Sequence, residues 1–384
     1  MDEYRENRFK NVQKAVAAAF AAIFFVALFA TFITSGGECA YAEKKAPASG
    51  SAAAVEVSTG RVLYQENADI KMPMASTTKI LTAITVLEHV PDPSAIVIIK
   101  REAVGIEGSS IYLREGEKLT VLELLYGLML RSGNDSAAAL ALFTAGSIEG
   151  FAELMNETAS AAGATSSNFV NPHGLNHKDH YTTAKDLAMI SAYAMKNPIF
   201  KKVVSTKRIS ISGEPRRYLV NKNKMLWEYE GATGIKTGFT KVAGRCLVSS
   251  AERNGMEVVS VVLNTGPMWE KSKQILDYAF SNYKLMPLYD KERMTTFAPV
   301  TGAKGKYAVL AAEKPPLYPL KSEELKRIKI EVKPFELKAP LKGGEDGGYF
   351  LVSLDNRLLY TGKLYNIGSV KRKGIADFFK KSGG

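Results

Sequence analysis

The pattern of apolar and polar positions predicts helices in the first part of the chain. Residues 80–87 have the apolar density of a buried helix, which begins near Ser76. Thr120-Val121-Leu122-Glu123 has the sequence of a capping box and predicts a helix through about Leu130. The run from Asp135 onward is rich in Ala and Leu and predicts another helix. A short loop is expected to join the last two.

Strands are predicted further along the same part. Two apolar runs, Cys246–Ala251 and Met256–Leu263, flank Asn254-Gly255, which is the signal of a tight β-hairpin. Just before them, three glycines fall within residues 231–238. Glycine inside a strand is typical of a place where another backbone approaches closely. We therefore expect a strand there that packs against a neighbouring segment.

The pattern changes beyond Pro287. Residues 327–332 alternate strictly between polar and apolar, and the runs 349–354 and 357–364 flank an Asp355-Asn356 turn. Proline and glycine separate these runs from one another. This part is expected to form a small all-beta module, and it contains no candidate catalytic group.

The N-terminus has the features of a secretory signal peptide over residues 1–42. Four basic residues precede an apolar run from Ala15 to Ile33, and Ala40-Tyr41-Ala42 is a small-x-small cleavage site. The run is also long enough to span a bilayer, so an uncleaved anchor is the alternative. Glu38 rather than a small residue precedes Cys39, which argues against lipid attachment. We expect an exported protein at the cell wall or the outer face of the cytoplasmic membrane.

Charge and cysteine content agree with an exported chain. The formal net charge is +12, and residues 1–42 contain equal numbers of acidic and basic residues, so the charge belongs to the mature part. Such a charge favours anionic wall polymers and lipid headgroups over nucleic acid, although a soluble basic surface is the simpler interpretation. Without the signal peptide, Cys246 is the only cysteine, which excludes an intramolecular disulfide. Its apolar strand places it in the core.

Three short motifs predict a serine acyl-transfer site: Ser76-Thr77-Thr78-Lys79, Ser132-Gly133-Asn134 and Lys236-Thr237-Gly238. A serine hydroxyl is a poor nucleophile near neutral pH. A lysine one helical turn away can take its proton if burial and nearby cations keep the amine neutral. The i, i+3 spacing of Ser76 and Lys79 places both side chains on one helix face.

The other two motifs supply the remaining chemistry. Ser132 can pass a proton between the lysine and the leaving amine, and Asn134 can hold a substrate amide. Lys236 adds a second cation, Thr237 offers a hydroxyl to a carboxylate, and Gly238 lets substrate backbone lie against the strand.

An oxyanion hole is expected from the backbone N–H groups of Ser76 and Phe239. Each motif alone is common, but the three together in this order form the set found in penicillin-interacting serine enzymes. With their flanking residues in 75–82, 129–137 and 236–244, they resemble the D-alanyl-D-alanine carboxypeptidases, the low-molecular-weight penicillin-binding proteins. The resemblance covers roughly Ala46 to Leu285 and, less sharply, the C-terminal part.

This resemblance implies a hydrolase that removes the terminal D-alanine from peptidoglycan stem pentapeptides and is acylated by beta-lactams. It implies Ser76 as the nucleophile and Lys79 as its base, with Ser132, Asn134 and Lys236 completing the catalytic set. Substrate binding falls to residues 237–239, and no cofactor or metal is implied. The implied fold is α+β, a five-stranded, largely antiparallel sheet flanked by helices as in beta-lactamases and transpeptidases, followed by the small beta domain.

One feature departs from the family pattern. Some relatives place an arginine shortly after the strand that follows the hairpin, where it helps to fix the substrate carboxylate. Residues 265–271 contain no arginine here. The carboxylate therefore depends on Thr237 and Lys236, unless another group replaces the arginine.

Other functions account for fewer features. His173, His177 and His180 suggest a metal site, but the surrounding Asn, Pro and Gly predict a loop, in which structural roles are more typical. A serine beta-lactamase shares the motifs, yet Glu153 and Asn156 are three residues apart rather than four and fall in a predicted helix. A transpeptidase normally carries a large module before its serine. An inactive wall-binding homologue would have no need of a base beside its serine.

The length after processing fits two domains. We expect a catalytic domain over residues 43–286, a beta-rich domain over 287–366 that acts as a spacer or docking module, and a basic tail over 367–384. In the tail, Ile375, Phe378 and Phe379 form an apolar face between lysines. The tail is either a short amphipathic membrane segment or a solvated end.

Overall fold

The computed structural model describes residues 50–291 and 294–374. The expected signal peptide, the alternative anchor and the apolar residues of the tail lie outside these ranges. Among the described helices, none is by itself long and apolar enough to cross a membrane, and only α4 (Asn134–Ala145) with α5 (Ile148–Ala161), bent by 86°, reaches the necessary length and composition as a pair.

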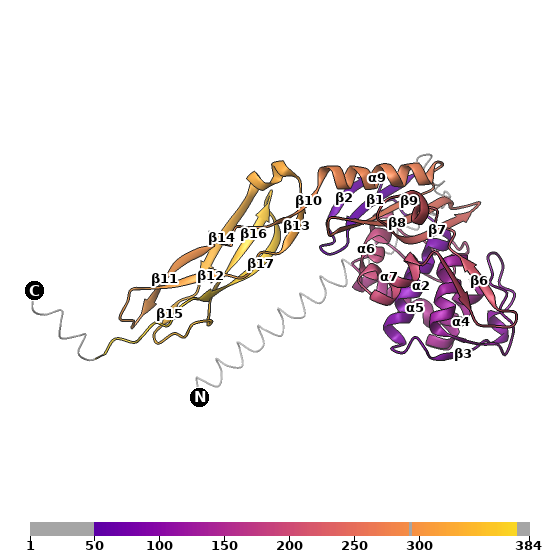
Figure 1. Cartoon of the computed structure of the whole chain (residues 1–384), viewed down its shortest axis with the longest axis horizontal. Coiled ribbons are helices and arrows are strands. Elements are labelled where there is room, and N and C mark those ends of the chain that lie inside the picture. Colours follow the sequence, from indigo (N-terminus) through magenta and orange to yellow (C-terminus); the bar gives the residue numbers. More distant parts are fainter. Residues whose placement is uncertain (1–49, 292–293, 375–384) are drawn as a thin grey trace, which may run out of the picture. The chain divides into compact units, whose positions relative to one another are not determined.

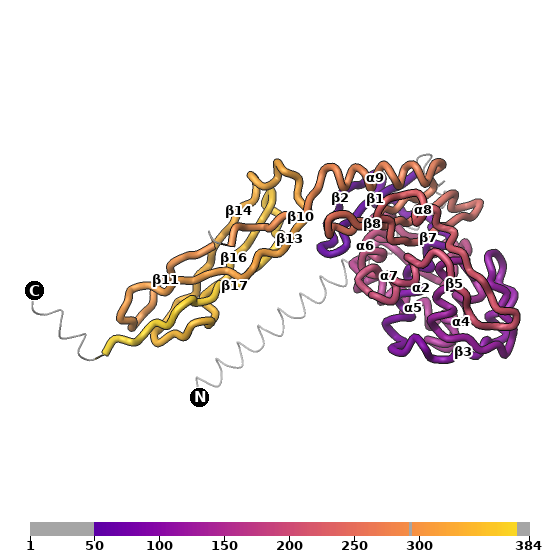
Figure 2. The backbone as a smooth tube through the Cα atoms, in the orientation of Figure 1, coloured from indigo at the N-terminus to yellow at the C-terminus, as the bar shows by residue number. Residues whose placement is uncertain are grey.

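A five-stranded antiparallel sheet lies at the centre of the first part, with helices on both faces (Figure 1). Its order, β2-β1-β9-β8-β7, places the first strand beside the last ones, as the colours of Figure 2 show. The strands are β1 (Ser51–Glu56), β2 (Val62–Glu66), β7 (Ala232–Thr240), β8 (Gly244–Arg253) and β9 (Met256–Leu263).

The middle strand, β9, is mostly apolar because both of its faces are covered. All eight residues of β9 are buried. Val258 and Val262 pack with the helix α9 (Met268–Asn282), whereas Val259 and Val261 belong to the larger core on the other face. Successive side chains of a strand point to opposite faces, so a strand covered on both sides is mostly apolar on both. The two polar residues of β9 are hydrogen-bonded: Glu257 accepts from Lys201 Nζ (2.8 Å), and Ser260 Oγ accepts from Ser272 Oγ (3.3 Å).

The predicted hairpin is confirmed. Arg253 pairs with Met256, and both turn residues, Asn254 and Gly255, have positive φ. A two-residue turn of this kind matches the twist of the flanking strands.

The predicted capping box is also confirmed. Thr120 Oγ1 accepts a hydrogen bond from Glu123 N (3.2 Å), and Glu123 Oε2 accepts one from Thr120 N (2.9 Å). The box opens α3 (Val121–Tyr126), which continues as a π-helical turn, η3 (Gly127–Arg131). The next helix begins one residue earlier than predicted, because Asn134 is the first residue of α4 rather than part of the preceding loop.

The remaining elements of the first part surround this frame. Helix α6 lies against β1 and β9, and α2 runs through the main core. The short 3-10 turn η1 leads directly into α2. Their bounds are η1 (Ala75–Thr78), α2 (Lys79–His89), β3 (Ile96–Ile98), η2 (Arg101–Ala103), β4 (Lys118–Thr120), α4 (Asn134–Ala145), α5 (Ile148–Ala161), α6 (Ala184–Met195), α7 (Pro198–Ser205), β5 (Arg208–Ile211), β6 (Arg217–Val220) and α8 (Met225–Glu228).

The second part is a six-stranded sheet in the order β14-β16-β17-β12-β11-β15, with its own core. Tyr289 and Phe350 meet edge to face in that core, with ring centroids 5.0 Å apart. The predicted strands and their Asp355-Asn356 turn are confirmed. The elements are β10 (Lys284–Pro287), β11 (Thr295–Thr301), β12 (Tyr307–Ala312), β13 (Leu317–Leu320), η4 (Ser322–Arg327), β14 (Ile328–Pro334), β15 (Leu337–Lys338), β16 (Asp346–Leu354) and β17 (Arg357–Asn366).

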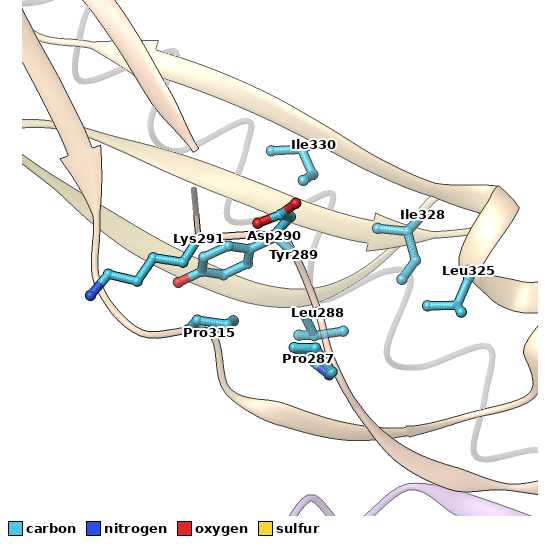
Figure 3. A pocket seen from close by; sticks show the side chains of 9 residues that line it. All are labelled: Pro287, Leu288, Tyr289, Asp290, Lys291, Pro315, Leu325, Ile328 and Ile330. Carbon is cyan, nitrogen blue, oxygen red and sulfur yellow. The ribbon is translucent and has the colours of Figure 1, made fainter. Parts of the chain in front are cut away.

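A groove of about 540 Å³ lies in this part, between the segment 287–291 and the side chains of Leu325, Ile328 and Ile330 (Figure 3). Asp290 and Lys291 bring the charged groups of its lining, and Pro315 closes one side.

Gly174 holds a loop against the start of α2. Its φ is +85°, and a Cβ added there would lie 2.6 Å from the carbonyl carbon of Ala75 and 2.8 Å from Thr78 Oγ1. Only a residue without a side chain permits this approach. The loop around Gly174 and the turn η1 are thus packed backbone to backbone.

Replacement of Gly174 should therefore destabilise the protein more than its dihedral angle alone explains. Gly255 is a matched control, since its φ is +76° but an added Cβ would meet nothing within 4 Å. We expect Gly255→Ala to lower the free energy of unfolding by about 1–2 kcal/mol. Gly174→Ala should lower it by roughly 1–3 kcal/mol more, because the added methyl overpacks the contact. Urea unfolding measures both, and equal losses would contradict the packing argument.

Candidate active site

The serine of the first motif lies in the turn before α2. Ser76 belongs to η1 and is half-buried, whereas Lys79 is the first residue of α2 and is fully buried. Lys79 Nζ lies 3.2 Å from Ser76 Oγ. The structure therefore brings the nucleophile and the base of the predicted pair into hydrogen-bond contact.

Two further oxygens surround the lysine amine. Lys79 Nζ donates to Asn134 Oδ1 and to the backbone carbonyl of His173, each at 2.6 Å. Both are pure acceptors, and a neutral amine has two N–H groups and one lone pair. The two acceptors take the two N–H groups, which leaves the lone pair for the Ser76 hydroxyl. This is the arrangement that a lysine needs in order to act as a base.

The surroundings of Lys79 favour the neutral amine. Burial holds the pKa of Lys79 well below its usual value of 10.5. The positive charge of Lys236 lowers it further, Asp135 opposes this, and Lys222 has the smallest lowering effect of the three. Burial and the charge of Lys222 also lower the pKa of Lys236, to about 7.

The second motif spans the junction of η3 and α4, with Asn134 as the first residue of α4. Ser132 has a left-handed backbone, with φ of 66°, and its buried Oγ has no hydrogen-bond partner among the described residues. Asn134 is fixed by its backbone N–H, which donates to Ser109 O (2.7 Å), and by its Nδ2, which donates to Glu107 O. Its Oδ1 is therefore turned toward Lys79.

The third motif lies on β7, at the edge of the sheet. Lys236 is buried and its Nζ donates to Thr237 O at 2.9 Å. Thr237 is half-buried, and the side chain of Phe239 is 66% exposed. A Cβ added to Gly238 would lie 3.1 Å from Ser76 N, so the glycine allows β7 to run against η1. The predicted close approach of another backbone to this strand is confirmed.

Hydrogen bonds thus unite Ser76, Lys79 and Asn134, whereas Lys236 acts on them through its charge. Ser132, Thr237 and Phe239 come from elements next to this centre and make no side-chain hydrogen bond to it. The His173 carbonyl is a partner that sequence reasoning missed. A main-chain oxygen has no residue-type signal, so no motif could have identified it.

The histidines have structural surroundings. His180 is buried, and its Nε2 lies 2.9 Å from Thr78 Oγ1, while its Nδ1 accepts from Val170 N. Burial lowers the pKa of His180 to about 3, with smaller effects of neighbouring charges, and burial with the charge of Lys79 lowers that of His173 to about 4. His177 is exposed. Among the described residues, no group of three or more His, Cys, Asp or Glu could hold a metal ion.

The other candidates from the sequence also have structural roles. Cys246 is in the core as predicted, and burial raises the pKa of its thiol to about 11. Asn156 lies on α5, and its side chain exchanges hydrogen bonds with the backbone of Phe169. Glu153 lies on the same helix.

Comparison with known proteins agrees with this site. Residues 39–266 match the family model described as D-alanyl-D-alanine carboxypeptidase. The chain is 32% identical over 346 residues to D-alanyl-D-alanine carboxypeptidase DacF of Bacillus subtilis, which covers 87% of this chain and 89% of the relative. It is 28% identical over 323 residues to DacA of Escherichia coli, covering 79% of each.

Among solved structures, penicillin binding protein 5 from Haemophilus influenzae superposes with a TM-score of 0.68 at 25% identity, over 84% of this chain and 97% of that one. The α+β fold expected from the resemblance, with an antiparallel five-stranded sheet and a following beta domain, is confirmed. The chain therefore belongs to the D-alanyl-D-alanine carboxypeptidase family of serine peptidases.

Proposed function

We propose that the enzyme removes the terminal D-alanine of peptidoglycan stem pentapeptides through an acyl-enzyme on Ser76. The observation that carries this proposal is the environment of Lys79 Nζ. Two acceptors and a serine hydroxyl surround an amine whose burial disfavours its charge. A structural lysine would instead be paired with a carboxylate.

In the first step, Lys79 takes the Ser76 proton while Oγ attacks the carbonyl carbon of the penultimate D-alanine. The N–H groups of Ser76 and Phe239 stabilise the resulting oxyanion. The tetrahedral intermediate then collapses: the peptide C–N bond breaks, and the proton returns from Lys79 through Ser132 to the leaving amine. Buried and without a partner of its own, the Ser132 hydroxyl is suited to this relay.

In the second step, water attacks the ester on Ser76 with Lys79 again as the base. The ester C–O bond breaks, Lys79 returns to Ser76 Oγ the proton that it took from water, and the shortened peptide leaves and loses its carboxylic acid proton to solvent. Asn134 holds the substrate amide beside the lysine, and Lys236 with Thr237 binds the terminal carboxylate. Lys222, whose Nζ lies 3.4 Å from Ser109 Oγ, adds positive charge at the same centre.

Beta-lactams mimic the D-alanyl-D-alanine terminus, since they carry a carboxylate and a reactive amide carbonyl. We propose that they acylate Ser76. The Glu153 and Asn156 pair does not support a beta-lactamase instead, because the Asn156 amide is used to bind the Phe169 backbone.

The proposed setting is extracytoplasmic. Residues 1–42 are proposed to direct export, residues 43–286 to form the catalytic domain, and residues 287–366 to act as a spacer or docking module. The basic tail, residues 367–384, and the net charge of +12 support peripheral contact with the membrane rather than with nucleic acid.

Ser76→Ala should abolish both penicillin labelling and D-alanine release, with a loss on the order of 10⁶-fold, as is typical when a catalytic serine is removed. Intact-mass analysis after penicillin treatment measures the adduct directly. Ser94→Ala is the control, since Ser94 is an exposed serine bonded only to Asp92. Labelling that persists in Ser76→Ala would assign the nucleophile to another residue.

The rate of penicillin acylation should rise with pH as Lys79 loses its proton. Since the pKa of Lys79 is held below 10.5, the midpoint of the rising limb should lie below that pH. The apparent pKa measured in this way describes Lys79 and Lys236 together, because their charges interact. Lys222→Gln removes a charge that lowers the pKa values of both Lys79 and Lys236, so the limb should move to higher pH. Lys185→Gln, which only breaks an ion pair with Asp69, is the control. An unmoved limb in Lys222→Gln would contradict this electrostatic account.

The enzyme should require a free terminal carboxylate. Amidation of the terminal D-alanine should lower kcat/KM about tenfold or more, because unpaired polar groups at a site cost ~1–3 kcal/mol. Thr237→Val should narrow the gap between acid and amide, whereas Thr237→Ser, which keeps the hydroxyl, should preserve it. Equal turnover of the two substrates by the wild type would show that the carboxylate is not recognised.

A further inference from the structure

Tyr112 is an exposed aromatic residue in an unusual backbone conformation. Tyr112 is 82% exposed, and its φ of 60° lies in the left-handed region. A bulky residue in that region costs of order 1–3 kcal/mol and persists only where the surroundings enforce it. An exposed ring returns little of this free energy through burial.

The backbone on both sides of Tyr112 is held by a buried carboxylate. Asp135, which follows Asn134 on α4, accepts hydrogen bonds from Ser110 Oγ at 2.6 Å, from Ile111 N at 3.1 Å and from Leu113 N at 3.1 Å. The residues that precede and follow Tyr112 are thus tied to one side chain in the first turn of α4.

A second charged side chain fixes the carbonyl groups of the same segment. Arg217, on β6, donates from Nε to Ile111 O (2.7 Å) and from Nη2 to Tyr112 O (2.9 Å). Its guanidinium is itself held by both carboxylate oxygens of Glu117, at 2.5 and 2.8 Å. A buried carboxylate and a partly buried guanidinium therefore hold the backbone that carries an exposed ring.

The same loop forms one side of the catalytic centre. Ser109 O accepts from Asn134 N, and Glu107 O accepts from Asn134 Nδ2. Ser109 Oγ also lies 3.4 Å from Lys222 Nζ. On its other side, the Ile111 side chain packs so closely against η3 that a Cβ on Gly127 would lie 2.7 Å from Ile111 Cδ1. Tyr112 is thus three residues away from the group that positions the amide anchor.

We propose that Tyr112 contacts the stem peptide on the acyl side of the scissile bond, upstream of D-alanyl-D-alanine. This inference rests on the proposed carboxypeptidase function. The terminal carboxylate is assigned to β7, so the peptide that precedes the scissile bond must extend away from that end of the site. Each extended residue adds about 3.3 Å. A Tyr ring presents an apolar face for aliphatic side chains and a hydroxyl for amide groups, and because its backbone is already held, only its side-chain torsions lose freedom on binding.

The test compares D-alanine release from a short and a long substrate. N-acetyl-D-alanyl-D-alanine ends at the reacting residues, whereas the pentapeptides with L-lysine or diaminopimelate at the third position contain the upstream part. We expect Tyr112→Ala to lower the ratio of kcat/KM for long over short substrate roughly three- to tenfold, from the ~0.5–1.5 kcal/mol of an aromatic contact. Tyr112→Phe should keep most of the ratio. Tyr307→Ala is the control, since Tyr307 is 58% exposed on β12 of the second sheet.

A purely structural role of the loop gives a different result. Tyr112→Gly removes the ring but relieves the left-handed backbone, so it should lower the ratio as much as Tyr112→Ala if the ring binds substrate. A normal ratio in Tyr112→Gly, or the same ratio in wild type and Tyr112→Ala, would overturn the proposal. These outcomes leave the carboxypeptidase assignment intact as long as the wild type releases D-alanine. Absence of release from both substrates by the wild type would overturn both proposals.

Discussion

The site depends on the burial of one lysine amine. Moving an ammonium group out of water is costly, and a protein commonly avoids this by pairing the charge or by lowering the pKa until the group is neutral. In the described part of the chain, no carboxylate lies within hydrogen-bond distance of Lys79 Nζ, and the two oxygens that accept from this amine are uncharged. The neutral form is therefore favoured by the same desolvation that the packed core around α2 creates. The packing of the core therefore also keeps the Lys79 amine able to accept a proton.

That constraint explains the architecture around η1. The two groups that accept from Lys79 are Asn134 of α4 and the His173 carbonyl in the loop before α6. Lys236, whose positive charge disfavours a charge on Lys79, comes from β7. All three segments must reach the first turn of α2. Gly238 and Gly174 make two of these approaches possible, since a Cβ at either position would press on the backbone of η1. The sheet supplies the rigid edge against which the serine turn is held.

The two parts of the chain have separate cores, and they differ in what they contribute to the proposed mechanism. The first part contains every group of the proposed mechanism, and it surrounds them with one large core continuous from α2 to β9. The second sheet has a separate core, centred on residues such as Phe350 and Leu310. Its strands β11 and β12 alternate between more buried and exposed positions, because only one face of each is covered.

Local sequence determined the features whose physics is local. The capping box at Thr120, the hairpin at Asn254-Gly255 and the i, i+3 spacing of Ser76 and Lys79 depend on a few neighbouring residues, and the structure contains all of them. The three motifs also identified the residue types of the site, and the resemblance of their flanking stretches indicated the fold. The start of α4 differed from the prediction by one residue, which is the spread expected for helix ends.

Only the tertiary structure decided which atoms meet. The carbonyl of His173 became a partner of Lys79 because of a loop nearly a hundred residues away in the chain, and a backbone oxygen carries no signature of its role. The fixed position of Tyr112 likewise arises from Asp135 and Arg217, which come from two different elements. The pKa of Lys79 is lowered mainly by burial, and side chains from many parts of the core together produce that burial. The amino-acid sequence by itself thus determined the chemical groups and the local turns, whereas distances, burial and charge coupling required the folded chain, because they depend on contacts between residues far apart in sequence.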